Sequence, residues 1–185
     1  HDELKAMEEV LEEAEKANMA CKVLDADYKW ASPAFPVWDK GKDKCRVVVA
    51  LGRVNMLMKL MHLIMPMTEH TIRRVLLATW VIGSDAKSAF QQMNTAKSTQ
   101  HALTFVTQVA ARASTGTPLG CKNAPQAFCQ EVDSMKTTCK DTVTHMDDFY
   151  NLGMTHYAAM LEFIKWMKEC EKKNLLLAAK KFQPF

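Results

Sequence analysis

Two adjacent aspartates, Asp147 and Asp148, separate two segments whose residues suit β-strands, 141–145 and 149–152. With only the tripeptide Met146-Asp147-Asp148 between them, the segments can form an antiparallel hairpin with both carboxylates at its tip. Like charges at such close range repel each other. The pair is therefore either a solvated polar turn or a site that holds divalent cations.

Helical and strand-like patterns alternate irregularly along the rest of the chain. Helices are predicted at 2–20, 68–80, 123–139 and 155–173, the last ended by Asn174, with a helical turn at 86–92. Further strands are predicted at 34–38, 46–51, 81–85, 103–109 and 175–178. Several of these strands must be antiparallel, so the predicted fold class is α+β. The 185 residues are 48% hydrophobic, enough to bury a real core.

Composition excludes several classes of protein. The longest strongly apolar stretch, 75–83, is far shorter than the roughly 20 residues that a membrane-spanning helix needs. The acidic N-terminal segment lacks an apolar run, so we expect no signal peptide and no secretion. The six cysteines form neither a C-x-x-C pair nor a zinc-finger spacing, which is typical of free thiols in a reducing, intracellular compartment.

A third carboxylate is a candidate partner for the aspartate pair. Asp85 ends the apolar segment VIGSD and precedes a helical turn, a position where a sheet edge can fix a carboxylate. Three carboxylates can hold two Mg²⁺ ions roughly 4 Å apart, an arrangement that stabilises the attacking and leaving oxygens of an in-line phosphoryl transfer. Spacing alone favours the solvated turn, and the motifs around the aspartates reverse that interpretation.

A set of motifs occurs in one fixed order along the chain. They are FPVW at 35–38, the basic segment 40–46 followed by VVV, Asn55, SDAKSAFQQ at 84–92, PLG-x-KNAP-x-x-F at 118–128, MDD at 146–148, and NL-x-L-x-x-KK at 174–181. Together they resemble the reverse transcriptase domain of gypsy-type LTR retrotransposons and, more distantly, that of retroviruses. The resemblance covers nearly the whole chain, from about Leu4 to Phe185.

The resemblance implies a right-hand polymerase made of fingers and palm, with a mainly antiparallel palm sheet packed on helices. Residues about 1–83 and 91–118 would contribute the N-terminal and fingers parts, and the palm would take Asp85 and 119–185. A thumb and an RNase H segment are expected to be absent. The implied activity is that of an RNA-directed DNA polymerase, in which a primer 3′-hydroxyl attacks a deoxynucleoside triphosphate on a nucleic-acid template.

Three aspartates match the catalytic triad of this family: Asp85, Asp147 and Asp148. The resemblance implies that they bind two Mg²⁺ ions, or Mn²⁺ in their place, and that both metals take part in nucleotidyl transfer. His145 and Met146 directly precede the aspartate pair and are expected at the primer end.

Six further residues match nucleotide-binding positions of the family: Lys40, Lys42, Arg46, Phe90, Leu119 and Gly120. The three cationic residues would grip the triphosphate, because their donors suit phosphate oxygens. The aromatic ring of Phe90 would lie under the incoming sugar and disfavour a 2′-hydroxyl. The turn at 119–120 would shape the nucleotide pocket.

The chain departs from the family pattern at three places. Ala50 and Gly52 stand where the family usually has an aspartate and an arginine, His145 replaces a tyrosine, and Cys45 replaces an aromatic residue. The first change removes an ion pair or hydrogen-bond network of the fingers. The triad itself is intact, so the chemistry remains feasible.

Two alternative functions stay open at this stage. An inactive, domesticated or degenerate reverse-transcriptase-like domain would serve as a nucleic-acid or protein binding module, and the residues at Ala50, Gly52 and His145 favour it. A metal-dependent nuclease would share the carboxylate chemistry, but the motifs around Phe90 and 118–125 would then have no purpose.

The expected partners follow from the implied reaction. They are an RNA or DNA template with its primer, deoxynucleoside triphosphates, and either the remaining polyprotein domains or a second subunit, with no membrane partner. The net charge of +3 supports nucleic-acid binding only where basic residues cluster in the cleft. The family resemblance implies an intracellular location, in a cytoplasmic particle or the nucleus.

Overall fold

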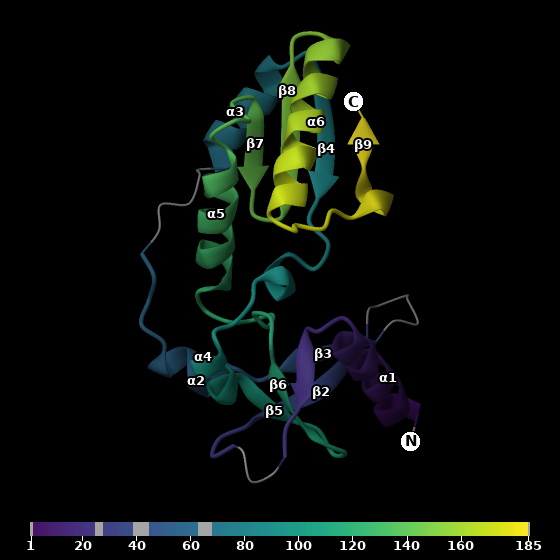
Figure 1. Ribbon diagram of the computed structural model, residues 1–185, viewed down its shortest axis with the longest axis vertical. Helices are drawn as coiled ribbons and strands as arrows, with labels where there is room; N and C mark the ends of the chain where they lie inside the picture. Colours follow the sequence, from purple (N-terminus) through teal and green to yellow (C-terminus); the bar gives the residue numbers. More distant parts are fainter. Residues whose placement is uncertain (1, 25–27, 39–44, 63–67, 185) are drawn as a thin grey trace. The chain divides into compact units, whose positions relative to one another are not determined.

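The helices and strands of the computed structural model form two compact units (Figure 1). The structure describes residues 2–24, 28–38, 45–62 and 68–184. Unit 1 comprises residues 1–60 and 90–124, and unit 2 comprises residues 61–89 and 125–185. The division into fingers (about 1–83 and 91–118) and palm (Asp85 and 119–185) stays a prediction.

Unit 1 is built on a five-stranded sheet. Its elements are α1 (Asp2–Lys16), β1 (Ala20–Lys22), β2 (Ser32–Trp38), β3 (Cys45–Val49), α2 (Gly52–Leu57), α4 (Lys97–Gln100), β5 (Thr104–Val106) and β6 (Ala111–Ser114). The strand order is β1-β6-β5-β2-β3, in which β2 and β5 are parallel and the other neighbours are antiparallel. Two 3₁₀ turns, Ala89–Gln92 and His101–Leu103, connect these elements.

Helix α1 is fixed to this sheet by apolar packing and by a buried cation. Met7 and Leu11 pack against Ala20 and Phe105 of the sheet. The guanidinium of Arg112 on β6 is almost fully buried and donates to the carboxylates of two glutamates on α1, Glu8 at 2.7 Å and Glu15 at 2.6 Å. Because both acceptors are charged, these are among the stronger hydrogen bonds in a protein.

Asparagines in the left-handed conformation end two of the helices. Asn18 follows α1 with φ of 55°, and Asn174 follows α6 (His156–Lys172) with φ of 54°. At each end, the amides of the asparagine and of the residue after it donate back to the last turn in the pattern of a Schellman motif. Examples are Met19 N to Ala14 O at 2.9 Å and Leu175 N to Cys170 O at 2.8 Å. The predicted end at Asn174 is confirmed, whereas the N-terminal helix ends four residues before the predicted position 20.

Unit 2 is a four-stranded antiparallel sheet with helices packed on it. Its elements are α3 (Thr68–Leu77), β4 (Trp80–Asp85), α5 (Ala124–Met135), β7 (Thr142–His145), β8 (Asp148–Gly153), α6, a 3₁₀ turn (Ala179–Lys181) and β9 (Gln183–Pro184). The strand order is β7-β8-β4-β9. Figure 1 shows α6 lying across β8 and β4, where Phe149 and Trp166 are fully buried with ring centroids 4.8 Å apart.

A buried polar network sets the alignment of the strands in unit 2. The Asn151 side chain on β8 donates to the Ile82 carbonyl of β4 at 3.2 Å and accepts from Thr142 of β7 at 2.9 Å. Thr142 also lies 3.3 Å from the buried carboxylate of Glu162 on α6. Any other strand alignment would break this network and leave buried polar groups unpaired. Because unpaired buried polar groups are costly, the network favours the observed alignment.

The predicted α+β fold class is confirmed, with corrections to individual elements. The strand predicted at 175–178 is wrong: that segment makes only an isolated bridge, between Leu177 and Ala86, and then enters a 3₁₀ turn. Sequence analysis missed α2, α4, β1, β6 and β9. In the part of the chain that is described, no helix is both long and apolar enough to cross a bilayer.

The close packing of α6 on β8 predicts the effect of adding one methyl group. A Cβ atom at Gly153 would lie 2.4 Å from Ala159 N and 2.9 Å from Ala159 Cα, so the helix would have to move. We expect Gly153→Ala to lower the free energy of unfolding by about 2 kcal/mol or more in denaturant titrations followed by circular dichroism. Gly52→Ala is the control, because nothing lies within 4 Å of its added Cβ. Equal stability of the two variants would contradict this packing.

Candidate active site

The register between β4 and β8 brings two predicted site residues face to face. Asp85 ends β4 and pairs with Asp148, the first residue of β8. Residues directly opposite in an antiparallel pair lie on the same face of the sheet, with Cβ atoms roughly 5 Å apart. The two carboxylates, 63 positions apart in the sequence, therefore share one end of the sheet.

The third aspartate lies in the turn between β7 and β8. His145 pairs with Asp148, so Met146 and Asp147 form a two-residue hairpin loop. Met146 has φ of 53°, whereas Asp147 does not have a positive φ, the pattern of a type II′ turn. The positive φ of Met146 is strained for a residue with a side chain, and such strain is common at functional sites. The Asp147 carbonyl accepts from Ala86 N at 2.9 Å, which ties the loop to the residue after Asp85.

A lysine that sequence analysis left without a role completes this end of the sheet. The Lys181 ammonium lies 2.9 Å from both carboxylate oxygens of Asp85. The pKa of Lys181 is raised by this hydrogen bond and by the charge of Asp85. Lys181 was part of the quoted NL-x-L-x-x-KK motif, but only the fold brings it to Asp85.

The negative charges of the site oppose one another. Burial raises the pKa of Asp148, and the neighbouring charges of Asp147 and Asp85, with a hydrogen bond to Asp85, raise it further. Burial and the charges of Asp148 and Asp147 likewise raise the pKa of Tyr150. A cation at this position would relieve the repulsion, as the Lys181 ammonium does in part.

These residues fit a divalent cation of the hard, oxygen-preferring type. Within the described residues, no three His, Cys, Asp or Glu side chains converge closely enough to hold a metal ion by themselves. Mg²⁺ in phosphoryl-transfer sites is usually bound by one or two carboxylates together with substrate phosphates and water. Asp85 and Asp148 are such a pair, and the ammonium against Asp85 marks a place where a cation is stabilised.

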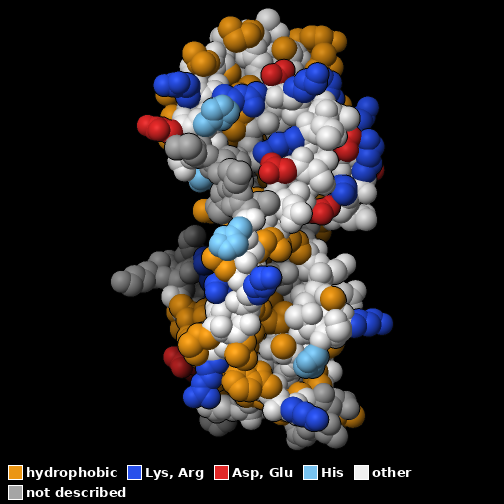
Figure 2. Space-filling model, turned by 90° about the vertical axis from the view of Figure 1, so that its left-hand side faces the viewer, with side chains coloured by type: hydrophobic (Ala, Val, Ile, Leu, Met, Phe, Trp, Pro, Cys, Tyr) orange, Lys and Arg blue, Asp and Glu red, His pale blue; other side chains and the backbone are white. Residues whose placement is uncertain are grey.

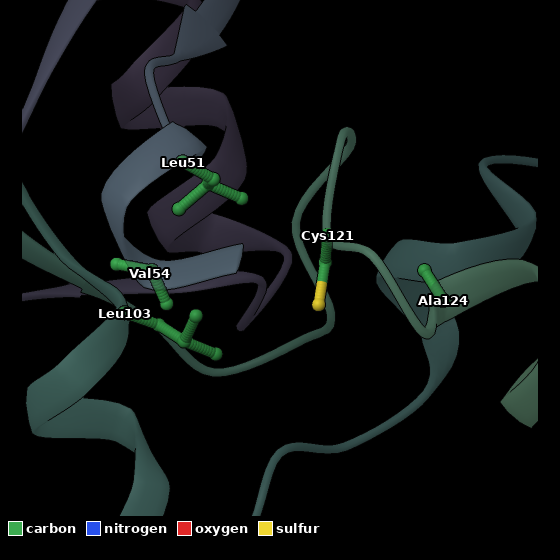
Figure 3. Packing of buried hydrophobic residues seen from close by; sticks show 5 residues of the cluster. All are labelled: Leu51, Val54, Leu103, Cys121 and Ala124. Carbon is green, nitrogen blue, oxygen red and sulfur yellow. The ribbon is translucent and has the colours of Figure 1, made fainter. Parts of the chain in front are cut away.

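Other predicted site residues belong to unit 1. Arg46 is exposed on β3 opposite Val37, and Lys40 and Lys42 lie outside the described residues. Phe90 is partly buried against an apolar cluster drawn in Figure 3, which consists of Leu51, Val54, Leu103, Cys121 and Ala124. The three aspartates, in contrast, belong to unit 2.

The predicted pocket turn is held by a second residue that sequence analysis left without a role. The Asn55 amide on α2 donates to the Gly120 carbonyl at 2.8 Å, and its oxygen accepts from Lys122 N at 2.8 Å. Gly120 has φ of 85°, a conformation that favours glycine. Leu119 is half exposed beside it. Asn55 was quoted among the motifs, but its two partners lie 65 and 67 residues away in the sequence.

The residues that depart from the family pattern at 45 and 50–52 contribute to the packing and backbone hydrogen bonds of unit 1. Leu51 is buried in the cluster of Figure 3, and Gly52 begins α2. Cys45 is buried at the start of β3. Ala50 donates from its backbone amide to the Pro33 carbonyl at 2.9 Å. Ala50 and Gly52 supply neither the carboxylate nor the guanidinium expected there.

Comparison with known families places this chain in one of them. The family model described as reverse transcriptase (RNA-dependent DNA polymerase) matches residues 38–185. Because the match covers most of the chain, the protein belongs to the reverse transcriptase family. None of the curated proteins compared with the chain matches it.

Solved structures of foamy virus proteins have the same fold. The native prototype foamy virus protease-reverse transcriptase matches with a TM-score of 0.85 and 15% identity, over 98% of this chain and 24% of that one. The foamy viral protease-reverse transcriptase in complex with dsDNA matches with a TM-score of 0.82 and 18% identity, over 96% of this chain and 37% of that one. The chain thus spans about a quarter to a third of these proteins.

Burial of Asp148 and repulsion from the neighbouring carboxylates together predict that this aspartate destabilises the metal-free fold. The pKa of Asp148 is raised, so its contribution to stability is present below the ordinary value of 3.8 and is lost as the pH rises through the folded value. We expect Asp148→Asn to raise the melting temperature in EDTA at neutral pH, by an amount that shrinks as the pH falls toward 3.8. Thermal unfolding across this pH range measures both effects.

Asp133→Asn is the matched control, since Asp133 is half exposed and pairs with Lys136 on the surface. Surface pairs contribute about 0–1 kcal/mol, so this change should leave the melting temperature nearly unaltered. A lower melting temperature for Asp148→Asn at neutral pH would contradict the proposed repulsion.

Proposed function

We propose that this chain is the fingers and palm part of an RNA-directed DNA polymerase, which transfers deoxynucleotides to a primer 3′-hydroxyl. The observation that carries the proposal is the pairing of Asp85 with Asp148 at one sheet end, in a chain of the reverse transcriptase family. The palm would include Asp85 and about 119–185, and the fingers about 1–83 and 91–118. The division into two compact units supports a two-part organisation.

The aspartates Asp85, Asp147 and Asp148 would hold Mg²⁺, with Mn²⁺ as an alternative. Two such ions, when bound, would lower the pKa of the attacking hydroxyl and neutralise the charge of the departing pyrophosphate. The chain itself contributes the placement of the carboxylates: the β4–β8 register positions two of them, and the hairpin loop positions the third. His145 and Met146, on the same hairpin, would contact the primer end.

The nucleotide would be bound by residues of unit 1. Arg46, with Lys40 and Lys42, offers charged donors for the triphosphate. Phe90 would lie under the sugar, and its packing on the apolar cluster of Figure 3 supports a fixed ring position. The turn with Leu119 and Gly120, which Asn55 holds by two hydrogen bonds, would shape the pocket.

The template and primer would be held mainly through their backbones. Solved foamy viral relatives are complexes with dsDNA and with an RNA/DNA hybrid, which supports a primer–template duplex as the partner. Figure 2 shows basic and acidic side chains interspersed on one face of unit 2, in keeping with the modest net charge. Further polyprotein domains or a second subunit would add contacts to the duplex.

A gypsy-type retrotransposon origin is the finer assignment that we propose within the family. It rests on the order of the quoted motifs, from FPVW at 35–38 to NL-x-L-x-x-KK at 174–181. An intracellular location, in a cytoplasmic particle or the nucleus, goes with this origin, and the six free cysteines are in keeping with it.

A second candidate function is a binding module that keeps the fold without the chemistry. The residues at 50 and 52 favour it, because the structure places only a methyl group and a glycine there. Such a module would bind nucleic acid or a partner protein equally well with or without the three aspartates.

Metal-dependent addition of one nucleotide separates these two functions. With Mg²⁺ or Mn²⁺, a primer annealed to an RNA template should gain a deoxynucleotide, and the Asp147→Asn/Asp148→Asn double variant should lose at least roughly 10³-fold in rate. Single-turnover gel assays at saturating primer–template measure this rate. Asp133→Asn should keep the wild-type rate. Binding without any addition, unchanged in the double variant, would favour the binding module.

Discrimination between ribonucleotides and deoxynucleotides tests the proposed role of Phe90. If its ring disfavours a 2′-hydroxyl, Phe90→Val should raise the use of ribonucleotides relative to deoxynucleotides by roughly 10²-fold, the usual discrimination against an added hydroxyl in an apolar pocket. The ratio of kcat/KM values for the two sugars measures this effect. Because Phe90 packs on the apolar cluster, thermal unfolding of the variant is the control. An unchanged ratio in a folded variant would contradict the assignment.

A further inference from the structure

The ion pair between Lys181 and Asp85 lies inside the carboxylate site. The ammonium is 2.9 Å from each oxygen of Asp85, so it contacts both oxygens of the carboxylate at once. The Asp85 side chain is only 9% exposed, whereas that of Lys181 is 64% exposed. A buried charge is thus compensated by a cation that reaches it from solvent.

Backbone bonds fix the segment that carries Lys181. Ala178 N donates to the Asp85 carbonyl at 2.7 Å, and Lys87 N donates to the Leu176 carbonyl at 2.9 Å. The 3₁₀ turn 179–181 follows, and β9 then pairs with Ile82 and Gly83 of β4. The Lys181 backbone is therefore anchored on both sides, and its long side chain is the part that can move.

We propose, on the basis of the function proposed above, that Lys181 is the counter-ion of the metal-free site and that a divalent metal must displace it from Asp85. Two cations cannot occupy the same face of one carboxylate without strong repulsion. An exposed lysine side chain has many alternative rotamers, so it can leave while the backbone stays in place.

Displacement gives Lys181 a measurable effect on metal affinity. The ion pair with Asp85 exists only while the metal is absent, so it stabilises the metal-free form relative to the metal-bound form. Any interaction confined to one of two states shifts the binding equilibrium toward that state. Removing the ammonium should therefore strengthen metal binding and weaken the metal-free fold.

Mn²⁺ binding to the full chain, followed by electron paramagnetic resonance of the free ion, tests the proposal without an activity assay. We expect Lys181→Met to bind Mn²⁺ roughly tenfold more tightly than the wild type, within the usual range of coupling between two ligands. Lys181→Arg keeps a cation near Asp85 and should bind close to the wild-type affinity. Lys180→Met removes an exposed charge from the same turn and controls for net charge.

The melting temperature in EDTA is the second measurement. It should fall for Lys181→Met and stay near the wild-type value for Lys180→Met. Equal Mn²⁺ affinity of these two variants, with Asp85→Asn binding more weakly than the wild type, would overturn the role of Lys181 and leave the proposed metal site intact. If Asp85→Asn binds Mn²⁺ as tightly as the wild type, both the role of Lys181 and the proposed function fail.

Discussion

The antiparallel register between β4 and β8 is the constraint on which the candidate site depends. A shift of one residue would turn Asp85 away from Asp148, because side chains alternate between the faces of a sheet. The buried amide of Asn151 opposes such a shift through its bonds to β4 and β7. The register therefore rests on polar contacts three residues away from the carboxylates as well as on the core beneath them.

The same site departs from what stability alone would favour. The charges of Asp147 and Asp85 repel the charge of Asp148, and Met146 has a left-handed backbone angle that favours glycine. The rest of unit 2 compensates, with fully buried Phe149 and Trp166 under the strands. Charge repulsion and backbone strain at one place are typical of a binding or catalytic site, in which a bound ligand supplies the missing stabilisation.

Features that depend on neighbouring residues could be predicted from the sequence, whereas contacts between residues far apart in the sequence could not. The hairpin around Asp147 and the end of α6 at Asn174 depend on neighbouring residues, and both could be predicted. Strand β1 could not, because three residues without alternation carry no pattern, and its partner is about 90 residues away. The same reason applies to Asn55 and Lys181: each was visible in a motif, but its partner is brought near only by the fold.

A crystal grown with Mn²⁺ and a deoxynucleoside triphosphate would reveal whether Asp85 and Asp148 together form a divalent-metal site. Anomalous scattering locates manganese independently of the model of the protein. A metal site at this pair predicts an anomalous peak within coordination distance, roughly 2.2 Å, of carboxylate oxygens from both aspartates. Manganese bound only elsewhere on the chain, with the Asp85–Lys181 pair still in place, would contradict it.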